Sequence, residues 1–560
     1  MADQREPGGV GRREFLRNAG LLGAASMMPS LLVACSSDSG TTTTAAGAVT
    51  TTAPQGGIAT TTSLAGGVAA GILRVRTWGG YSGVLDPMEI PTFLEFQTLA
   101  PVVESLVGWI PGTADVVNVL AESLDASDDG LAYEFTLKGG IPFHGGYGEV
   151  TAEDVKFSLE RAAASEFAVS RDQGLGRIAS VEVTGPLSGV IRLTGPYALF
   201  ATSTLARWSS GIVSQAAVND LGDLFRASPI CTGPYRVIAE SFQPDSGLTL
   251  ARFEEYGGAA SDQAPIASYD EIVYNVVIDD NPAVIALETG ELTYSWLGGT
   301  SVGQFEGVDG FRVDPSNLLG WNYMGMNVQH RLLSDVNLRK AVRWGIDSQE
   351  IIDGALAGRG QPTNFLLPEG MLGFWPEAPV YTRDLERARE LFEAGGAPTD
   401  ELEILVEQAQ VHRSAAEIIS EQLREVGFNT VVRVVDSAAV QQYRQQDPPS
   451  ADSAFHYSTA IYLGFDPADT TLLFTSSRIG TTSASFWSSE RYDELWAEGL
   501  VETDPARREE IYVEMQQIFD EEMPQILVST VTQWYAGRDT IEPSFHAIGF
   551  PLYHFFGGSI

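Results

Sequence analysis

Ordered patterns of apolar and polar residues begin near residue 72 and continue along the chain. Residues 72–76 predict a strand, and residues 133–137 alternate apolar and polar side chains, which predicts a strand with one buried face. Thr151 precedes a helical pattern with Asp154 at its third position, which predicts a surface helix that begins with a capping interaction. The chain therefore mixes strands and helices from its first ordered segment.

A second region predicts a complete supersecondary unit. Residues 402–406 are a short apolar run, a helical pattern follows to residue 426, and residues 430–435 are again rich in valine. This order predicts a β-α-β unit with parallel strands. A lobe of mixed α/β layers is the architecture that such a unit favours.

The first residues have the features of an export signal. Arg12 and Arg13 precede an apolar run over residues 19–34, which is typical of a twin-arginine signal. The run is too short and too rich in small residues for a permanent membrane-spanning helix. Gly11 stands where Ser or Thr is usual, which leaves export by the Sec route open. The run ends in Leu-Val-Ala followed by Cys35, a sequence that resembles a lipobox, so we expect Cys35 to be acylated.

A linker rich in Thr, Ala and Gly follows, and we place it at residues 36–71. Few of its side chains can bury apolar surface, so it is expected to be disordered and to span roughly 35 Å. An acylated cysteine on such a linker holds a soluble body near a membrane without inserting it. We therefore predict an extracytoplasmic protein, periplasmic or at the cell surface, with a lipid anchor and no other membrane segment.

Charge and cysteine content narrow the possible partners. The 560 residues include 34 Lys and Arg against 73 Asp and Glu, a net charge of −39. Such a surface repels phosphate backbones, which argues against nucleic acid. Only two cysteines are present, so the fold depends on core packing without a disulfide framework. Cys231 is expected to be a small buried apolar residue.

Motifs for catalysis and metal binding do not have the context that they need. Residues 299–303 match a nucleophile-elbow pattern, but residues 304–310 do not predict the helix that must follow it. Residues 174–179 fit a dinucleotide fingerprint, yet a polar segment precedes them where a strand is required, so we predict a turn. The six histidines form no i, i+4 pair and no Cys/His cluster. We predict no catalytic residue, no metal and no cofactor, and a structural role for His144.

Several segments in order resemble one family of binding proteins. The resemblance is carried by the loop 141–146, the helix 150–161, Thr-Gly-Pro-Tyr at 232–235, the helix 338–347, the loop 358–368, the helix 388–396 and residues 491–495. These segments are similar to the corresponding motifs of family 5 of the bacterial solute-binding proteins, which includes dipeptide, oligopeptide and nickel receptors.

The resemblance implies an α/β, two-lobed periplasmic-binding-protein-like fold of class II type, with an accessory subdomain and mixed β-sheets flanked by helices. Lobe I would comprise residues 72–98, 211–318 and 528–560. The accessory subdomain would comprise residues 99–210, and lobe II residues 319–527. The lobes would close on a ligand between them.

The resemblance also implies a function. The chain would be a monomeric receptor that delivers a peptide or similar small solute to the permease and ATPase subunits of an ABC-type importer. A non-peptide solute, such as a glycoside, an opine or a metal chelate, is the first alternative. A ligand sensor that is not coupled to transport is the second.

Aromatic side chains are the first candidates for a ligand-binding cleft, because rigid rings make good walls. Trp321 and Tyr323 lie where the strand of the family crosses between lobes, and their spacing places both on one face. Tyr81, in the first loop of the body, and Trp487 are similar candidates. Each of these residues would instead be a core residue if its face is buried.

The segment 460–467 decides which solute is expected. It supplies Tyr462 and Asp466 as ligand-binding candidates, although Asp466 precedes a proline and could serve only to shape the turn. Peptide-binding relatives resemble one another in carrying an Asp that pairs with the amino group of the peptide, and here Leu463 takes that place. A buried ammonium without a partner is costly. N-acetylated peptides are therefore expected to bind at least as well as free ones, unless another acid replaces that Asp.

Overall fold

The computed structural model describes residues 71–77, 79–89, 93–165, 174–256, 267–446, 453–461 and 464–560, all within one compact unit, Gly66–Ile560. The predicted export signal with Arg12 and Arg13, the predicted acylation site Cys35 and almost all of the predicted linker lie outside the described residues. None of the helices in these stretches is long and apolar enough to cross a membrane.

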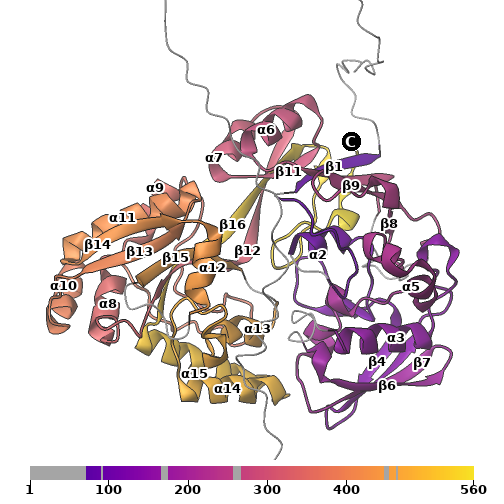
Figure 1. Ribbon diagram of the computed structural model, residues 1–560, viewed down its shortest axis with the longest axis horizontal. Helices are drawn as coiled ribbons and strands as arrows, with labels where there is room; N and C mark the ends of the chain where they lie inside the picture. The colour runs from indigo at the N-terminus through magenta and orange to yellow at the C-terminus, as the bar shows by residue number, and fades with distance from the viewer. Residues whose placement is uncertain are drawn as a thin grey trace, which may run out of the picture. The chain divides into compact units, whose positions relative to one another are not determined.

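Strands from distant parts of the chain meet in one mixed sheet (Figure 1). Ten strands of the described residues form it, in the order β14 (Asn429–Val435), β13 (Glu401–Glu407), β15 (Ser453–Ile461), β12 (Phe311–Met326), β16 (Gln525–Arg538), β11 (Tyr294–Leu297), β1 (Ile72–Thr77), β10 (Glu271–Val276), β9 (Gly247–Arg252) and β8 (Tyr235–Val237). β1 lies parallel to β10 and β11, and β13 lies parallel to β14 and β15. The remaining pairs are antiparallel.

The two longest strands, β12 and β16, connect the two halves of this sheet (Figure 1). Each of them extends across a predicted limit between lobe I and lobe II. Their pairing shifts register between Leu318 and Trp321 and again between Asn322 and Tyr323, next to the predicted limit at residue 318. Such bulges bend a strand and increase its twist. The lobe limits themselves stay a prediction.

A separate antiparallel sheet lies within the range predicted for the accessory subdomain. Its strands are β4 (Ala121–Ala126), β5 (Ala132–Leu137), β7 (Ser188–Leu193) and β6 (Ile178–Gly185), with α3 (Ala152–Ala163) packed against β6. Two short ladders complete the strands of the described residues, β2 (Val107–Trp109) with β3 (Val116–Asn118) and β17 (Ile541–Glu542) with β18 (Gly557–Gly558).

Most helices follow the chain between residues 280 and 522. The remaining α-helices are α2 (Phe93–Leu99), α5 (Gln215–Leu221), α6 (Asp280–Thr289), α7 (Gly299–Val302), α8 (Val336–Gly345), α9 (Ser348–Ala355), α10 (Leu385–Ala394), α11 (Gln410–Val426), α12 (Ser437–Arg444), α13 (Pro467–Thr471), α14 (Glu490–Val501) and α15 (Pro505–Glu522). Short 3-10 or π turns occupy His144–Gly146, Leu175–Arg177, Phe200–Thr204, Trp208–Ser210, Gly222–Ala227, Ala239–Ser241, Gly303–Phe305, Leu472–Phe474, Ser476–Arg478 and Tyr553–Phe555.

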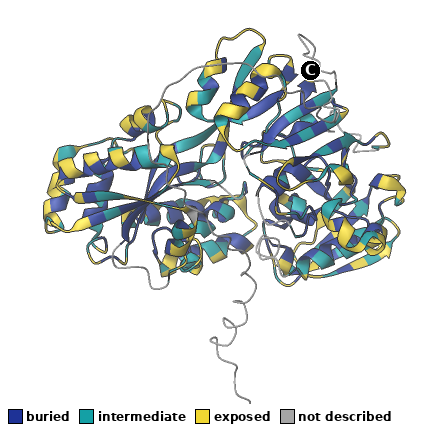
Figure 2. Ribbon diagram, turned by 45° about the horizontal axis from the view of Figure 1, so that its top comes forward, coloured by how far each residue is buried: buried dark blue, intermediate teal, exposed yellow. Residues whose placement is uncertain are grey.

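The apolar side chains gather in two main cores. One core contains only residues between 324 and 528, among them Met324, Ile404 and Phe455. The larger core joins the N-terminal strands, the four-stranded sheet and helices α13–α15. Figure 2 shows the strands mostly in the buried and intermediate colours, while most exposed residues lie on helices and loops. Burying one stripe of each helix against these strands is the main favourable contribution to the fold.

The local predictions are confirmed where the sequence pattern is complete. Thr151 caps α3, and Thr151 and Asp154 bond one another's backbone in a capping box. β13, α11 and β14 form the predicted β-α-β unit with parallel strands. Cys231 is fully buried. His144 donates from Nε2 to the Gly233 carbonyl at 2.8 Å and accepts at Nδ1 from the Cys231 N–H at 3.4 Å, which is the predicted structural role.

The two enzyme-like motifs lie in different surroundings. Residues 174–179 form the predicted turn: Gly174 has a φ of 99°, a 3-10 turn follows, and β6 begins at Ile178. As predicted, no α-helix follows the elbow-like motif: α7 coincides with the motif residues, and the 3-10 turn after it ends at Phe305. Ser301 of that motif lies inside α7 and hydrogen-bonds Asp280. It is not displayed on a sharp strand-to-helix turn, which a nucleophile elbow requires.

Candidate functional site

Trp321 and Tyr323 lie on one face of β12, where they oppose Ala460 and Ser458 of β15. Both side chains are buried, and the ring of Trp321 stacks on that of Phe474 with centroids 6.2 Å apart. The Tyr323 hydroxyl accepts a hydrogen bond from Nη2 of Arg444 at 3.0 Å. The strand therefore brings this predicted pair together, but in packed surroundings.

The other predicted aromatic residues have partners elsewhere. The Tyr81 hydroxyl lies 3.1 Å from the Thr98 hydroxyl, and burial raises the pKa of Tyr81. Trp487 donates from Nε1 to Oε2 of Glu522 at 2.6 Å. Both side chains are buried in the larger core. Tyr462, the remaining predicted aromatic residue, and Leu463 lie outside the described residues.

Asp466 has two structural partners. It caps helix α13 by accepting the Ala468 N–H at 2.9 Å. Both of its carboxyl oxygens also accept from Nη2 of Arg508, at 2.8 Å each. Burial raises the pKa of Asp466, and the guanidinium of Arg508 opposes that rise. The geometry matches the second of the two roles predicted for Asp466, which is to shape this turn.

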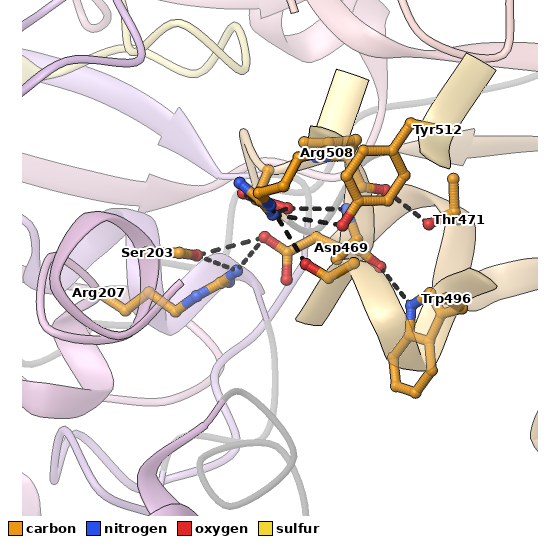
Figure 3. A network of polar contacts seen from close by, with 11 residues as sticks. Ser203, Arg207, Asp469, Thr471, Trp496, Arg508 and Tyr512 are labelled. Atoms are coloured by element: carbon orange, nitrogen blue, oxygen red, sulfur yellow. Dashed lines mark hydrogen bonds and ion pairs between the residues drawn. The ribbon is translucent and has the colours of Figure 1, made fainter. Parts of the chain in front are cut away.

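Helix α13 also contacts the range predicted for the accessory subdomain, and we call this contact the junction (Figure 3). Asp469 accepts from Nη2 of Arg207 at 2.9 Å and from the Ser203 hydroxyl at 3.3 Å. The side chains of Arg207 and Asp469 are 9% and 14% exposed, so this ion pair is largely shielded from water. Nearby, the Ala198 N–H donates to the Leu500 carbonyl at 2.9 Å.

The junction depends on one glycine. A Cβ at Gly464 would overlap Oδ2 of Asp469 and Nη2 of Arg207. The overlapping atoms are the ends of the two paired side chains, so a larger residue at this position would have to displace the ion pair. The residue next to it, Phe465, continues the contact.

Aromatic rings surround Phe465 at the junction. Its ring stacks on His546 with centroids 4.9 Å apart and meets Trp109 edge-on at 5.4 Å. His546 also stacks on Phe550 at 4.3 Å, and Trp208 lies edge-on to Phe550 at 5.2 Å. Four separate segments of the chain supply these rings. Such ring pairs add stabilisation beyond that of their buried area.

A cavity of about 100 Å³ lies beside these rings. Its polar and aromatic lining includes Glu104, Trp109, Trp208, Tyr256, His546 and His554. A cavity of only ten to fifteen Å³ in this measure holds about one water molecule, so this one has room for part of a small organic molecule.

Glu104 is the charged residue that lines the cavity. It is 8% exposed, and its Oε1 accepts from the Tyr256 hydroxyl at 2.7 Å. The Thr232 hydroxyl is close enough to lower the pKa of Glu104. No described residue, however, forms a hydrogen bond of good geometry with Oε2 of Glu104. Burial raises the pKa of Glu104 to about 7, against the opposing effects of Tyr256, Thr232 and Lys138.

The two histidines of the cavity are neutral rings. Burial lowers the pKa of His546 and that of His554 to about 3. Nδ1 of His546 accepts from the Ile548 N–H at 3.3 Å, so its proton lies on Nε2. That N–H has no hydrogen-bond partner among the described residues.

Sequence reasoning did not single out the residues of the junction and the cavity. Glu104 lies in an irregular segment, Trp109 ends the short strand β2 and Trp208 begins a 3-10 turn, and none of these short segments has a pattern that indicates a ligand site. Phe465 and Asp469 lie within a few residues of the predicted candidate Asp466. The only available signal was therefore the position of that segment, and no local pattern identified its partners.

Comparison with known proteins adds to this geometry. The model for the family described as bacterial extracellular solute-binding proteins, family 5 Middle, matches residues 115–479. The glutathione-binding protein GsiB of Salmonella choleraesuis (strain SC-B67) is 25% identical over 450 residues, which cover 79% of this chain and 86% of that protein.

Solved structures are similar along most of the chain. The ABC transporter-associated periplasmic binding protein DppA from Helicobacter pylori, in complex with the peptide STSA, has a TM-score of 0.72 at 22% identity and covers 87% of this chain and 97% of its own. The binding protein AgaA from A. tumefacien R10, in complex with agropinic acid, has a TM-score of 0.69 at 22% identity, with 87% and 96% covered. The predicted two-lobed α/β fold is confirmed.

Proposed function

Because the chain belongs to family 5 of the bacterial extracellular solute-binding proteins, we propose that it is the extracytoplasmic receptor of an ABC-type importer. It binds a peptide or a similar small solute between its lobes and delivers it to the permease and ATPase subunits. The match of the family model to residues 115–479 is the observation that carries this proposal. We propose no reaction, since the relatives compared above are binding proteins.

Peptides are the first solute class to consider. GsiB is a glutathione-binding protein and DppA was solved with a peptide, which supports this class. The second class is a non-peptide solute, which the agropinic acid complex of AgaA supports. Leu463 at the place of the Asp in peptide-binding relatives supports the second class as well.

Titration of the purified chain with glutathione, Ser-Thr-Ser-Ala and agropinic acid tests the function and separates the classes. Calorimetry gives each affinity, and small-angle scattering reports whether the lobes close. We expect saturable binding of at least one solute with a smaller radius of gyration in its presence. An unchanged radius at calorimetric saturation would contradict closure of the lobes.

Attachment to the membrane is the second part of the proposal. Acylation of Cys35 would hold the folded body near the membrane through the linker 36–71. Cys35→Ala is expected to release the protein from the membrane fraction, with Cys231→Ala as the control that leaves the anchor intact. A Cys35→Ala protein that stays with membranes after a salt wash would rule out the lipid anchor.

The export route is tested with the arginine pair. Arg12→Lys combined with Arg13→Lys is expected to stop export if the twin-arginine route is used, whereas Arg17→Lys leaves export unchanged. Fractionation of cells that express each variant measures this. Export of the double variant at the normal level would instead assign the chain to the Sec route.

A further inference from the structure

The cavity beside the junction contains an acid, and none of the described residues that line this cavity is a cation that could balance it. Glu104 lines it, and among the residues that line it there is no lysine or arginine. Arg207, the nearest arginine of the junction, is bonded to Asp469. Lys138 influences Glu104 from outside the lining, and its Nζ donates to the Asn118 carbonyl at 3.1 Å. A buried carboxylate normally has a cation or a full set of hydrogen bonds.

The other walls of the cavity favour the same kind of ligand. The rings of Trp109 and Trp208 meet edge to face with centroids 6.3 Å apart, and both residues line the cavity. Indole rings attract a cation that lies over their faces. The Nε2–H of His546 adds one donor, which suits a carbonyl oxygen next to a charged amine. An amine with a neighbouring carbonyl therefore suits the carboxyl group of Glu104, the two indole rings and the N–H of His546.

We propose that this cavity binds the positively charged amine of the transported solute, with Glu104 as its counter-ion and Trp109 and Trp208 as its aromatic walls. The proposal rests on the proposed function, because it names the chemical class of the solute. It also supplies the missing acid: with Leu463 in place of the Asp of peptide-binding relatives, Glu104 takes over recognition of the amine. Solutes with a free amine then bind better than their acylated forms.

The groups that surround Glu104 define how pH acts on this site. Tyr256 and Thr232 contact or approach its carboxyl group, Lys138 acts on it from the residue after β5, and His546 and His554 share its cavity as neutral rings. Glu104 changes charge near pH 7, whereas the two histidines stay neutral there because the pKa of each lies far below. Binding of an amine favours the ionised carboxylate, so it releases a proton when it occurs at or below pH 7.

The first experiment uses small probes on the purified full chain. Propylammonium chloride and the uncharged 1-propanol are titrated against the wild type, Glu104→Gln and Glu122→Gln, with sodium chloride as the ionic-strength reference. Glu122 is an exposed glutamate that also acts on Lys138, which makes it the matched control. We expect propylammonium to bind the wild type and the control at least tenfold more tightly than Glu104→Gln, and 1-propanol to show no such difference.

Calorimetry at pH 6 in two buffers of different ionisation enthalpy provides a readout that a structural role would not move. The wild type should release a proton for each bound propylammonium, and Glu104→Gln should release none. Equal affinity of the wild type and Glu104→Gln, absence of saturable binding to the wild type, or binding without proton release each overturns the proposal.

Peptide probes then separate this proposal from the function on which it rests. Free trialanine and N-acetyl-trialanine are titrated against the same three proteins. Peptide binding with no preference for the free amine would overturn the role of Glu104 and leave the receptor function intact. Binding of propylammonium through Glu104 without binding of any offered solute would support the amine site and overturn the proposed solute class.

Discussion

Two buried carboxyl groups on either side of the junction differ in what balances their charge. Asp466 caps α13 and holds the guanidinium of Arg508 with both oxygens. Glu104 is as deeply buried, but its cavity provides one phenol and no cation. Burial raises the pKa of both groups. A buried acid that has its cation within the chain completes the structure, whereas an acid without one is suited to a ligand.

We expect the largest loss of stability from a substitution at the pair of Asp466 and Arg508. Arg508→Met leaves Asp466 buried without its cation, so we expect the free energy of unfolding to fall by about 3–5 kcal/mol. Urea denaturation measures this loss. Arg507→Met, in the same helix, removes an exposed pairing with Glu498 and Glu510 and should cost less than about 1 kcal/mol. Equal losses in the two variants would show that the Asp466 pair adds no more than a surface pair.

For Glu104, the carboxyl group without a cation in its cavity, we expect a substitution to raise the free energy of unfolding. Burial raises the pKa of Glu104 from 4.5 to about 7, so its protonated form stabilises the folded state below pH 4.5, and this contribution is lost as the pH rises through 7. Glu104→Gln does not titrate there. We expect the variant to gain about 2–3 kcal/mol over the wild type between pH 5 and pH 8.

Unfolding free energies of both proteins at the two pH values test this expectation, with the exposed Glu122→Gln as control. A difference between wild type and Glu104→Gln that does not change with pH would mean that Glu104 is ionised without cost. The contrast with Asp466 would then disappear.

For the ion pair between Arg207 and Asp469, we expect a substitution to cost less stability than one at the pair of Asp466 and Arg508. Asp469→Asn keeps the shape of the side chain and removes its charge, so we expect a loss of about 2 kcal/mol in unfolding free energy. Because the pair joins the range predicted for lobe II to the range predicted for the accessory subdomain, the variant should also have a larger radius of gyration without solute. Gly464→Ala should reproduce both effects through its overlap with the pair.

Scattering and denaturation of Glu494→Gln give the baseline for that experiment, since Glu494 pairs with Arg491 on the exposed surface of α14. If Asp469→Asn has the stability and radius of the control, the junction does not hold the lobes together.

The smallest expected effect concerns the one strong hydrogen bond of Glu104. Tyr256→Phe removes the hydroxyl that donates to Oε1, and with it a stabilisation of the ionised form worth about 1 kcal/mol. The pKa of Glu104 should therefore rise further, by less than about one unit. The pH midpoint of the stability difference between Tyr256→Phe and the double variant with Glu104→Gln measures it. A midpoint at or below that of the wild type would contradict this role.

The sequence predicted the elements whose cause is local. Thr151 and Asp154 meet within one helical turn, so the capping box of α3 follows from spacing alone. The parallel pair β13 and β14 follows from two apolar runs on either side of an amphipathic helix. The two-lobed fold could be predicted because many short motifs occur in order, and their order carries topology.

The candidate site was harder to predict because a buried ring has the same pattern in a core and in a cleft. Tyr81 and Trp487 are core residues with hydrogen-bond partners that lie 17 and 35 residues away in the sequence. Asp466 was predicted beside the right segment, but its partner Arg508 comes from another helix. Glu104 gains its importance from Tyr256, His546 and Trp208, none of which lies near it in the sequence.

The pairing of β11 with β16 sets an order in which this chain can fold. Residues 294–297 of β11 find their partners only at residues 534–537. A ribosome that adds about 10 residues per second needs on the order of 20 s to make the intervening chain. The unit of β13, α11 and β14 has no such delay and can form early. Until β16 arrives, one edge of β11 remains a template for wrong pairing. By the proposed twin-arginine route, a folded chain would leave only after β16 has been made.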